Sequence, residues 1–166
     1  EYKRSEGSNL NNLGEAYFHL GEAQKAIEYY DQALAISREI ENKRSEGAAL
    51  GNLGEAYFHL GELQKAIEYH EQALAISRQI LDLYNEGENL SNIGKVNASL
   101  GDINKALGCY EKSLDIARRI NYRKIESDVL FNLGKIYVNL NETLNAIEYY
   151  TQSLMISREI EYRRGE

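Results

Sequence analysis

The chain has 166 residues, a formal net charge of −7 and an apolar content of 43%, which is enough to bury a core. No stretch concentrates basic residues, so neither nucleic acid nor an anionic membrane is expected as a partner. We find no apolar run of bilayer length and no signal-peptide stretch, which predicts a cytoplasmic location, and the single Cys109 excludes an internal disulfide.

The first predicted helix is marked by an apolar stripe. Leu10 is followed by Leu13, Tyr17 and Leu20, at offsets that bring all four side chains to one face of an α-helix. Gly21 then supplies the left-handed residue that commonly ends a helix. We therefore expect a helix that stops at about this glycine.

The second predicted helix begins beside Glu22, whose negative charge suits the positive end of a helix. Arg38 lies near its other end, where a cation is favoured for the same reason. Small residues alternate with large ones along its apolar face, which lets two helices approach closely. The residues expected on the buried side are Ala26, Ile27, Tyr30, Ala33, Leu34 and Ile40.

The sequence pattern of this helical hairpin occurs four times. The phrase at 12–17 returns at 52–57, more loosely at 92–97, and again at 132–137. The turn residues that correspond to the first glycine are Gly61, Gly101 and Asn141. A period of 40 residues predicts one domain that is a stacked array with an extended surface, not a closed globule. The expected repeats are 1–40, 41–80, 81–120 and 121–160, with the start of a fifth at 161–166 and a longer parent protein.

The third repeat departs most from the pattern. Asn97 and Cys109 stand where the first repeat has tyrosines, and Gly108 lies inside the second helix. A glycine in a helix costs about 1 kcal/mol relative to alanine. We predict that this repeat is the least stable, either through sequence drift or because it forms a joint or a ligand pocket.

The repeated residues resemble the consensus of the tetratricopeptide repeat (TPR) family. They are Leu10, Leu13, Gly14, Tyr17, Gly21, Ala26, Tyr30 and Ala33. The period of 40 exceeds the usual length of about 34, and this longer form is similar to the repeats of LGN/Pins-type scaffolds and of bacterial multi-repeat regulators. The resemblance implies an all-α fold, a right-handed α-solenoid of antiparallel helix hairpins, and a non-enzymatic protein-protein interaction scaffold.

No catalytic residue, cofactor or metal site is predicted. Glu15 with His19, and Glu55 with His59, are each four residues apart and share a helix face. Carboxylates and imidazoles on one ridge can hold a divalent metal, but the third and fourth repeats do not keep the pattern. A solvated polar ridge is the favoured interpretation.

The resemblance implies that the first helix of each hairpin lines a concave groove and that its non-packing residues contact an extended peptide or a partner helix. The expected partner-binding residues are Asn12, Glu15, Phe18, His19, Asn52, Glu55, Phe58, His59, Asn92, Lys95, Phe131, Asn132, Lys135 and Asn139. Regularly spaced asparagines can pair with a peptide backbone, or instead bridge adjacent helices.

Charge changes along this face. Glu15 and Glu55 are replaced by Lys95 and Lys135 in the later repeats. This predicts basic or aromatic ligand groups over the first two repeats and an acidic group or a C-terminal carboxylate near the lysines.

The sequence is also compatible with a second function. No polar capping helix follows Ile160, and an uncapped repeat exposes an apolar end. The alternative to a peptide-binding scaffold is therefore a structural spacer or a self-assembling array that stacks end to end.

Overall fold

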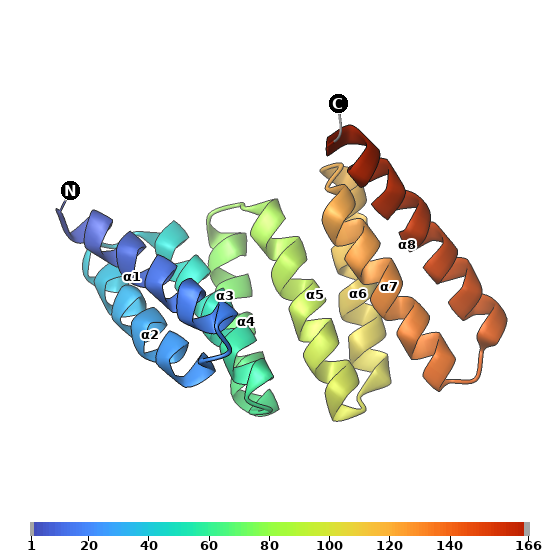
Figure 1. Cartoon of the computed structure of the whole chain (residues 1–166), viewed down its shortest axis with the longest axis horizontal. Coiled ribbons are helices and arrows are strands. Elements are labelled where there is room, and N and C mark those ends of the chain that lie inside the picture. The colour runs from blue at the N-terminus through green and yellow to red at the C-terminus, as the bar shows by residue number, and fades with distance from the viewer. Residues whose placement is uncertain (1, 165–166) are drawn as a thin grey trace. The chain divides into compact units, whose positions relative to one another are not determined.

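The computed structural model describes residues 2–164 and the side chains of residues 2–161. Within this range every regular element is an α-helix (Figure 1). The helices are α1 (Tyr2–His19), α2 (Ala23–Glu39), α3 (Lys43–His59), α4 (Leu63–Gln79), α5 (Leu83–Leu100), α6 (Ile103–Arg119), α7 (Arg123–Asn139) and α8 (Thr143–Arg164). We call the odd-numbered helices A helices and the even-numbered ones B helices.

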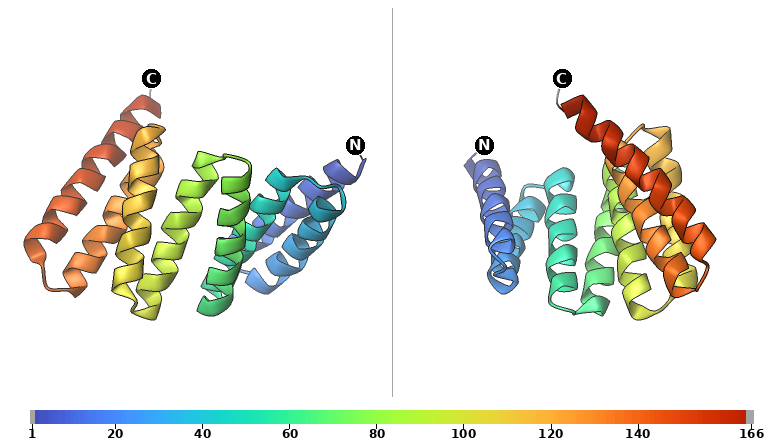
Figure 2. Two further views of the ribbon diagram at one scale, coloured as in Figure 1. Left: turned by 180° about the vertical axis from the view of Figure 1, so that it is seen from behind. Right: turned by 45° about the vertical axis from the view of Figure 1, so that its right-hand side comes forward.

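The chain divides into two compact units, unit 1 (Glu1–Asn85) and unit 2 (Glu86–Glu166), which are described separately. Unit 1 contains α1 to α4, and unit 2 contains α6 to α8 with nearly all of α5. Within unit 2, α7 and α8 run antiparallel and side by side (Figure 2). The sequence bounds of four repeats in a single domain stay a prediction, and residues 165–166 of the expected fifth repeat lie outside the described residues.

The turns inside the hairpins have the predicted left-handed residue. Gly21 has a φ of 81°, and Asn141, which replaces the glycine in the last hairpin, has a φ of 61°. A second left-handed position, between hairpins, was not predicted: Glu41, Leu81 and Asn121 have φ values of 54°, 55° and 55°. Backbone hydrogen bonds close this turn, because the Glu41 N–H donates to the Arg38 carbonyl oxygen at 3.2 Å.

The core of unit 1 is built where the B helix of one hairpin meets the A helix of the next. Its buried members are Ala26, Ile27, Tyr30, Ala33, Leu34, Ala49, Leu50, Leu53, Ala56 and Ala73. The predicted buried side of α2 is thus confirmed, apart from Ile40, which is only half-buried. Repeat position alone does not decide burial, since Leu53 is 0% exposed and its equivalent Leu13 on α1 is 46% exposed.

The core of unit 2 has the same character. Buried residues of α6 meet buried residues of α7, and partly buried Tyr122 and Tyr149 pack against them. The buried members are Ala106, Tyr110, Ala117, Ile125, Val129, Leu133 and Ile136.

The repeated glycine of the A helix is required by packing. A Cβ on Gly14 would lie 2.5 Å from a ring carbon of Tyr30, well inside van der Waals contact. The same close approach joins Gly54 to His70 and Gly134 to Tyr150. The glycine therefore lets an aromatic ring of the B helix lie directly on the A-helix backbone.

The third repeat lacks one interaction that the other repeats share. Stacked tyrosine pairs with ring centroids 5.2 Å apart join the A and B helices at Tyr17–Tyr29, Tyr57–Tyr69 and Tyr137–Tyr149. At the equivalent positions are Asn97, which is buried and donates from Nδ2 to the Ile93 carbonyl oxygen at 2.9 Å, and Cys109. Low stability of this repeat stays a prediction, and the missing stack gives it a structural reason.

Candidate ligand-binding site

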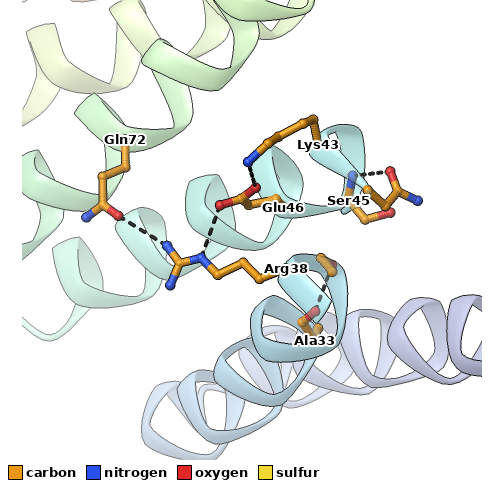
Figure 3. A network of polar contacts seen from close by, with 8 residues as sticks. Ala33, Arg38, Lys43, Ser45, Glu46 and Gln72 are labelled. Carbon is orange, nitrogen blue, oxygen red and sulfur yellow. Dashed lines mark hydrogen bonds and ion pairs between the residues drawn. The ribbon is translucent and has the colours of Figure 1, made fainter. Parts of the chain in front are cut away.

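A buried carboxylate fixes α3 against the hairpin before it. Glu46 of α3 accepts from Arg38 Nε at 3.0 Å and from Lys43 Nζ at 2.6 Å, and the guanidinium also reaches Gln72 of α4 at 3.5 Å (Figure 3). Burial alone would raise the pKa of Glu46, but the two cations outweigh it and hold that pKa below its usual value. Arg38 therefore does more than meet the end of its own helix.

Unit 2 repeats this cluster. Glu126 of α7 accepts from Arg118 Nε at 3.0 Å and from Arg123 Nη1 at 2.6 Å. The other terminal nitrogen of Arg123 donates to Glu159 of α8 at 2.7 Å. The same ionic contact thus joins α3 to α2 and α7 to α6.

In unit 1 the predicted ligand residues near the ends of the A helices contact one another. Glu15 and His19 are 3.7 Å apart, Glu55 and His59 are 3.4 Å apart, and the Phe18 ring meets His59 edge-on with centroids 4.7 Å apart. Phe18 is half-buried and packs against the core. This part of the face is an ordered polar and aromatic ridge.

Across residues 2–161, no three His, Cys, Asp or Glu side chains gather in an arrangement that could hold a metal ion. The glutamate and histidine pairs of α1 and α3 are contacts between residues four apart on one helix. Such pairs contribute little to stability or to metal affinity.

The row of asparagines is not uniform. Asn52 Nδ2 donates to Asn11 Oδ1 at 3.0 Å, which bridges α3 and α1. The bridging alternative is therefore correct at this position. Asn12, Asn92 and Asn132 make no side-chain hydrogen bond to another described residue, and each lines a pocket.

The pocket in unit 2 collects four predicted residues from two A helices. It has a volume of about 240 Å³, and its lining includes Asn92 and Lys95 of α5 and Phe131 and Asn132 of α7. Phe131 is 51% exposed even though its ring contacts Tyr150 at a centroid distance of 5.5 Å. The complete lining is Glu88, Ser91, Asn92, Lys95, Tyr122, Lys124, Ile125, Asp128, Phe131 and Asn132.

Two acidic residues of this pocket were not singled out from the sequence. Glu88 and Asp128 occupy the repeat position of Ser8 and Ala48. Partial burial raises the pKa of the Asp128 carboxyl, and the nearby ammonium of Lys124 opposes this only in part. The signal available in the sequence was the change from small to acidic residues at one repeat position.

The remaining predicted residues lie outside the two pockets. Lys135 and Asn139 are exposed along the outer side of α7. Glu55 and Phe58 are half-buried on α3, and Glu15 is exposed on α1. The structure thus brings Asn92, Lys95, Phe131 and Asn132 together in one pocket and places Glu15, His19, Phe18, Glu55 and His59 on the ridge of unit 1.

Paired helices joined by left-handed turns, stacked through glycine and aromatic contacts, define a helical-repeat protein of the all-α solenoid class. A family model described as the tetratricopeptide repeat matches residues 6–79 and 85–159. The chain belongs to the tetratricopeptide repeat family. The predicted family and fold class are both confirmed.

Solved structures agree with this assignment. The TPR domain of Arabidopsis FLU is 25% identical, with 70% of this chain and 98% of that chain covered and a TM-score of 0.68. A Rap protein complexed with Competence and Sporulation Factor is 23% identical, with 95% of this chain and 44% of that chain covered and a TM-score of 0.88. BtubC (BKLC) from P. vanneervenii is 21% identical, with 93% and 64% covered and a TM-score of 0.80.

No curated protein sequence matches the chain. Among the described residues, no helix combines the length and the apolar character that crossing a membrane requires.

Proposed function

We propose that the chain binds an extended peptide of a partner protein along the outer residues of its A helices, and that it is a non-enzymatic scaffold in the cytoplasm without nucleic-acid or membrane partners. The TPR fold supports protein interaction in general terms. The observation that carries the finer proposal is the pocket between α5 and α7, where two amide side chains, a lysine and an exposed phenylalanine converge.

The chemistry of this pocket suits a peptide backbone. Asn92 and Asn132 each offer an amide donor and an acceptor, and no described residue takes these groups. Lys95 adds a positive charge for an acidic group of the ligand, and the Phe131 ring adds apolar area for a side chain. The Rap protein of similar fold is known as a complex with Competence and Sporulation Factor, which is compatible with a ligand on such a surface.

The test is a selection of short random peptides displayed against the immobilised chain, followed by affinity measurement on the peptides selected. Lys95→Glu with Lys135→Glu should lower the affinity for acidic peptides by more than about tenfold. Lys112→Glu with Arg119→Glu on α6 changes the net charge equally away from the A helices and should have little effect. If no peptide is selected, or if both variants act alike, the proposal is wrong.

A second function, self-association end to end, is favoured by a different observation. Ile147 and Leu154 of α8 are 56% and 50% exposed, whereas their equivalents Ile27 and Leu34 of α2 are 3% and 6% exposed in the core that α2 forms with α3. The α1 helix of a second copy carries the same 12–20 segment as α3 at 52–60 and can occupy this apolar surface.

Analytical ultracentrifugation over a dilution series tests this second function. Stacking predicts oligomers that dissociate on dilution and are abolished by Ile147→Glu with Leu154→Glu. If the chain is a monomer at every concentration, the self-association proposal is rejected and the peptide-binding proposal stands.

A further inference from the structure

We infer that the pocket between α5 and α7 selects a peptide segment that carries a basic side chain and, about three residues away, an acidic one. This inference rests on the proposed peptide-binding function and adds the chemical identity of the ligand at that site. It follows from the order of the charges along the two helices that line the pocket.

The two helices present matching rows of residues. Glu88, Asn92 and Lys95 follow one another at offsets that keep them on one face of α5. Asp128, Asn132 and Lys135 lie at the same offsets on α7, each 40 residues later. Within these two rows, carboxylates therefore occupy one end, amides the middle, and ammonium groups the other end, while Lys124 adds a positive charge one turn before Asp128.

The acidic end suits a cation. Asp128 makes neither a side-chain hydrogen bond nor an ion pair with another described residue, although Lys124 lies one turn before it on α7. Its carboxyl is partly removed from water, and a second carboxylate, Glu88, lines the same pocket. The Phe131 ring lies one turn beyond Asp128 and can receive a lysine or arginine side chain on its face. A basic ligand group would offset the negative charge of Asp128.

The basic end suits an anion. Lys95 lines the pocket two helical turns after Glu88, and Lys135 occupies the equivalent position on the exposed side of α7. Seven residues of α-helix span about 10 Å. An extended peptide covers about the same distance in three residues. A peptide with opposite charges at this spacing can therefore meet both ends at once while its backbone lies over Asn92 and Asn132.

Unit 1 supplies the internal contrast. The pocket in the same place, between α1, α2 and α3, has a volume of about 140 Å³ and contains no charged side chain in its lining. Ser8 and Ala48 stand at the repeat positions of Glu88 and Asp128, and Glu15 and Glu55 stand at those of the two lysines. Recognition of paired opposite charges therefore belongs to unit 2.

The experiment is a selection from displayed random peptides with three forms of the full chain. The native chain should enrich peptides in which Lys or Arg stands about three residues from Asp or Glu. With Glu88→Lys and Asp128→Lys, the preference at the basic position should change to an acidic residue. The matched control, Ser8→Lys with Ala48→Lys in unit 1, should select the same peptides as the native chain.

Affinities measured on the selected peptides test whether the two carboxylates recognise the basic residue of the peptide. Glu88→Gln with Asp128→Asn should weaken binding about tenfold, and should have little effect on a peptide whose basic residue is replaced by glutamine. A folding defect would weaken both peptides equally. Selected peptides without the paired charges would overturn the inference and leave the proposed function intact, whereas failure to select any peptide would contradict the proposed function itself.

Discussion

Unit 1 and unit 2 share the same helix packing but differ in the side chains at the outer positions of their A helices. The glycine and ring contact is kept, since Gly14 lies against Tyr30 in unit 1 and Gly94 lies against Tyr110 in unit 2. The outer A-helix positions are not kept, because a pocket with no charged lining residue in unit 1 corresponds to one with four charged residues in unit 2. Packing is therefore conserved between the units where the helices touch, and chemistry changes where a ligand would touch.

The shared packing gives the largest expected effect. Gly14→Ala and Gly94→Ala should each lower the free energy of unfolding by about 2 kcal/mol, because the added Cβ would lie 2.5 Å and 2.8 Å from a ring carbon. Urea denaturation followed by circular dichroism measures this. Equal losses of stability would support the same glycine–ring packing in both units. If alanine is tolerated in either unit, the contact is not equivalent in the two units.

The ionic cluster is also shared and adds a pH dependence. Glu46→Gln should lower the free energy of unfolding by about 1.5 kcal/mol at neutral pH, because the buried side chain loses charged hydrogen bonds from Arg38 and Lys43. The pKa of Glu46 is lowered in the folded chain, so its contribution is present above the ordinary value of 4.5 and is lost as the pH falls through the folded pKa.

The measurement is the difference between native chain and variant in urea denaturation over a pH series. It should be largest near neutrality and should shrink in acid. Lys25→Gln provides the control, because that ammonium forms an exposed ion pair with Glu22. A difference that stays constant through the acid range would exclude the ionisation of Glu46 as its source.

The equivalent asparagines of the two units should have different roles. Asn52→Ala should lower the free energy of unfolding by about 1 kcal/mol, because the side chain bridges to Asn11 at 3.0 Å. Asn132→Ala removes the equivalent side chain in unit 2, which makes no such bridge, and should leave stability within about 0.5 kcal/mol. Binding of selected peptides should respond in the opposite order. Equal stability losses would mean that both asparagines are structural.

The helical hairpins could be predicted from the sequence because the residues that define them are close together in the chain. The Leu10 to Leu20 stripe and the Gly21 stop lie within one helix and its turn, and the 40-residue repetition states them four times. The left-handed turn at Leu81 carries no such signal, because leucine has no preference for that backbone conformation. A turn of this kind is set by the packing of the hairpins on either side of it.

The candidate site was predictable only in part for a related reason. Position on the A helix identified Asn92, Lys95, Phe131 and Asn132 as outer residues. Their convergence in one pocket with Asp128 depends on contacts between helices 40 residues apart, as does the bridge from Asn52 to Asn11. Exposure along one helix can be read from periodicity, but which neighbour each side chain meets requires the packed structure.

The smallest expected effect lies at Gly108, the helix-interior glycine of the third repeat. A Cβ there would meet nothing within 4 Å, in contrast to Gly94 in the same repeat. Gly108→Ala should therefore raise the free energy of unfolding by about 0.8 kcal/mol through helix propensity alone. Hydrogen exchange should slow mainly in α6, and the pair of variants separates the backbone cost of glycine from its packing role. If Gly108→Ala destabilises the chain, the glycine has a structural function, and the predicted low stability of the third repeat would rest on the missing tyrosine stack alone.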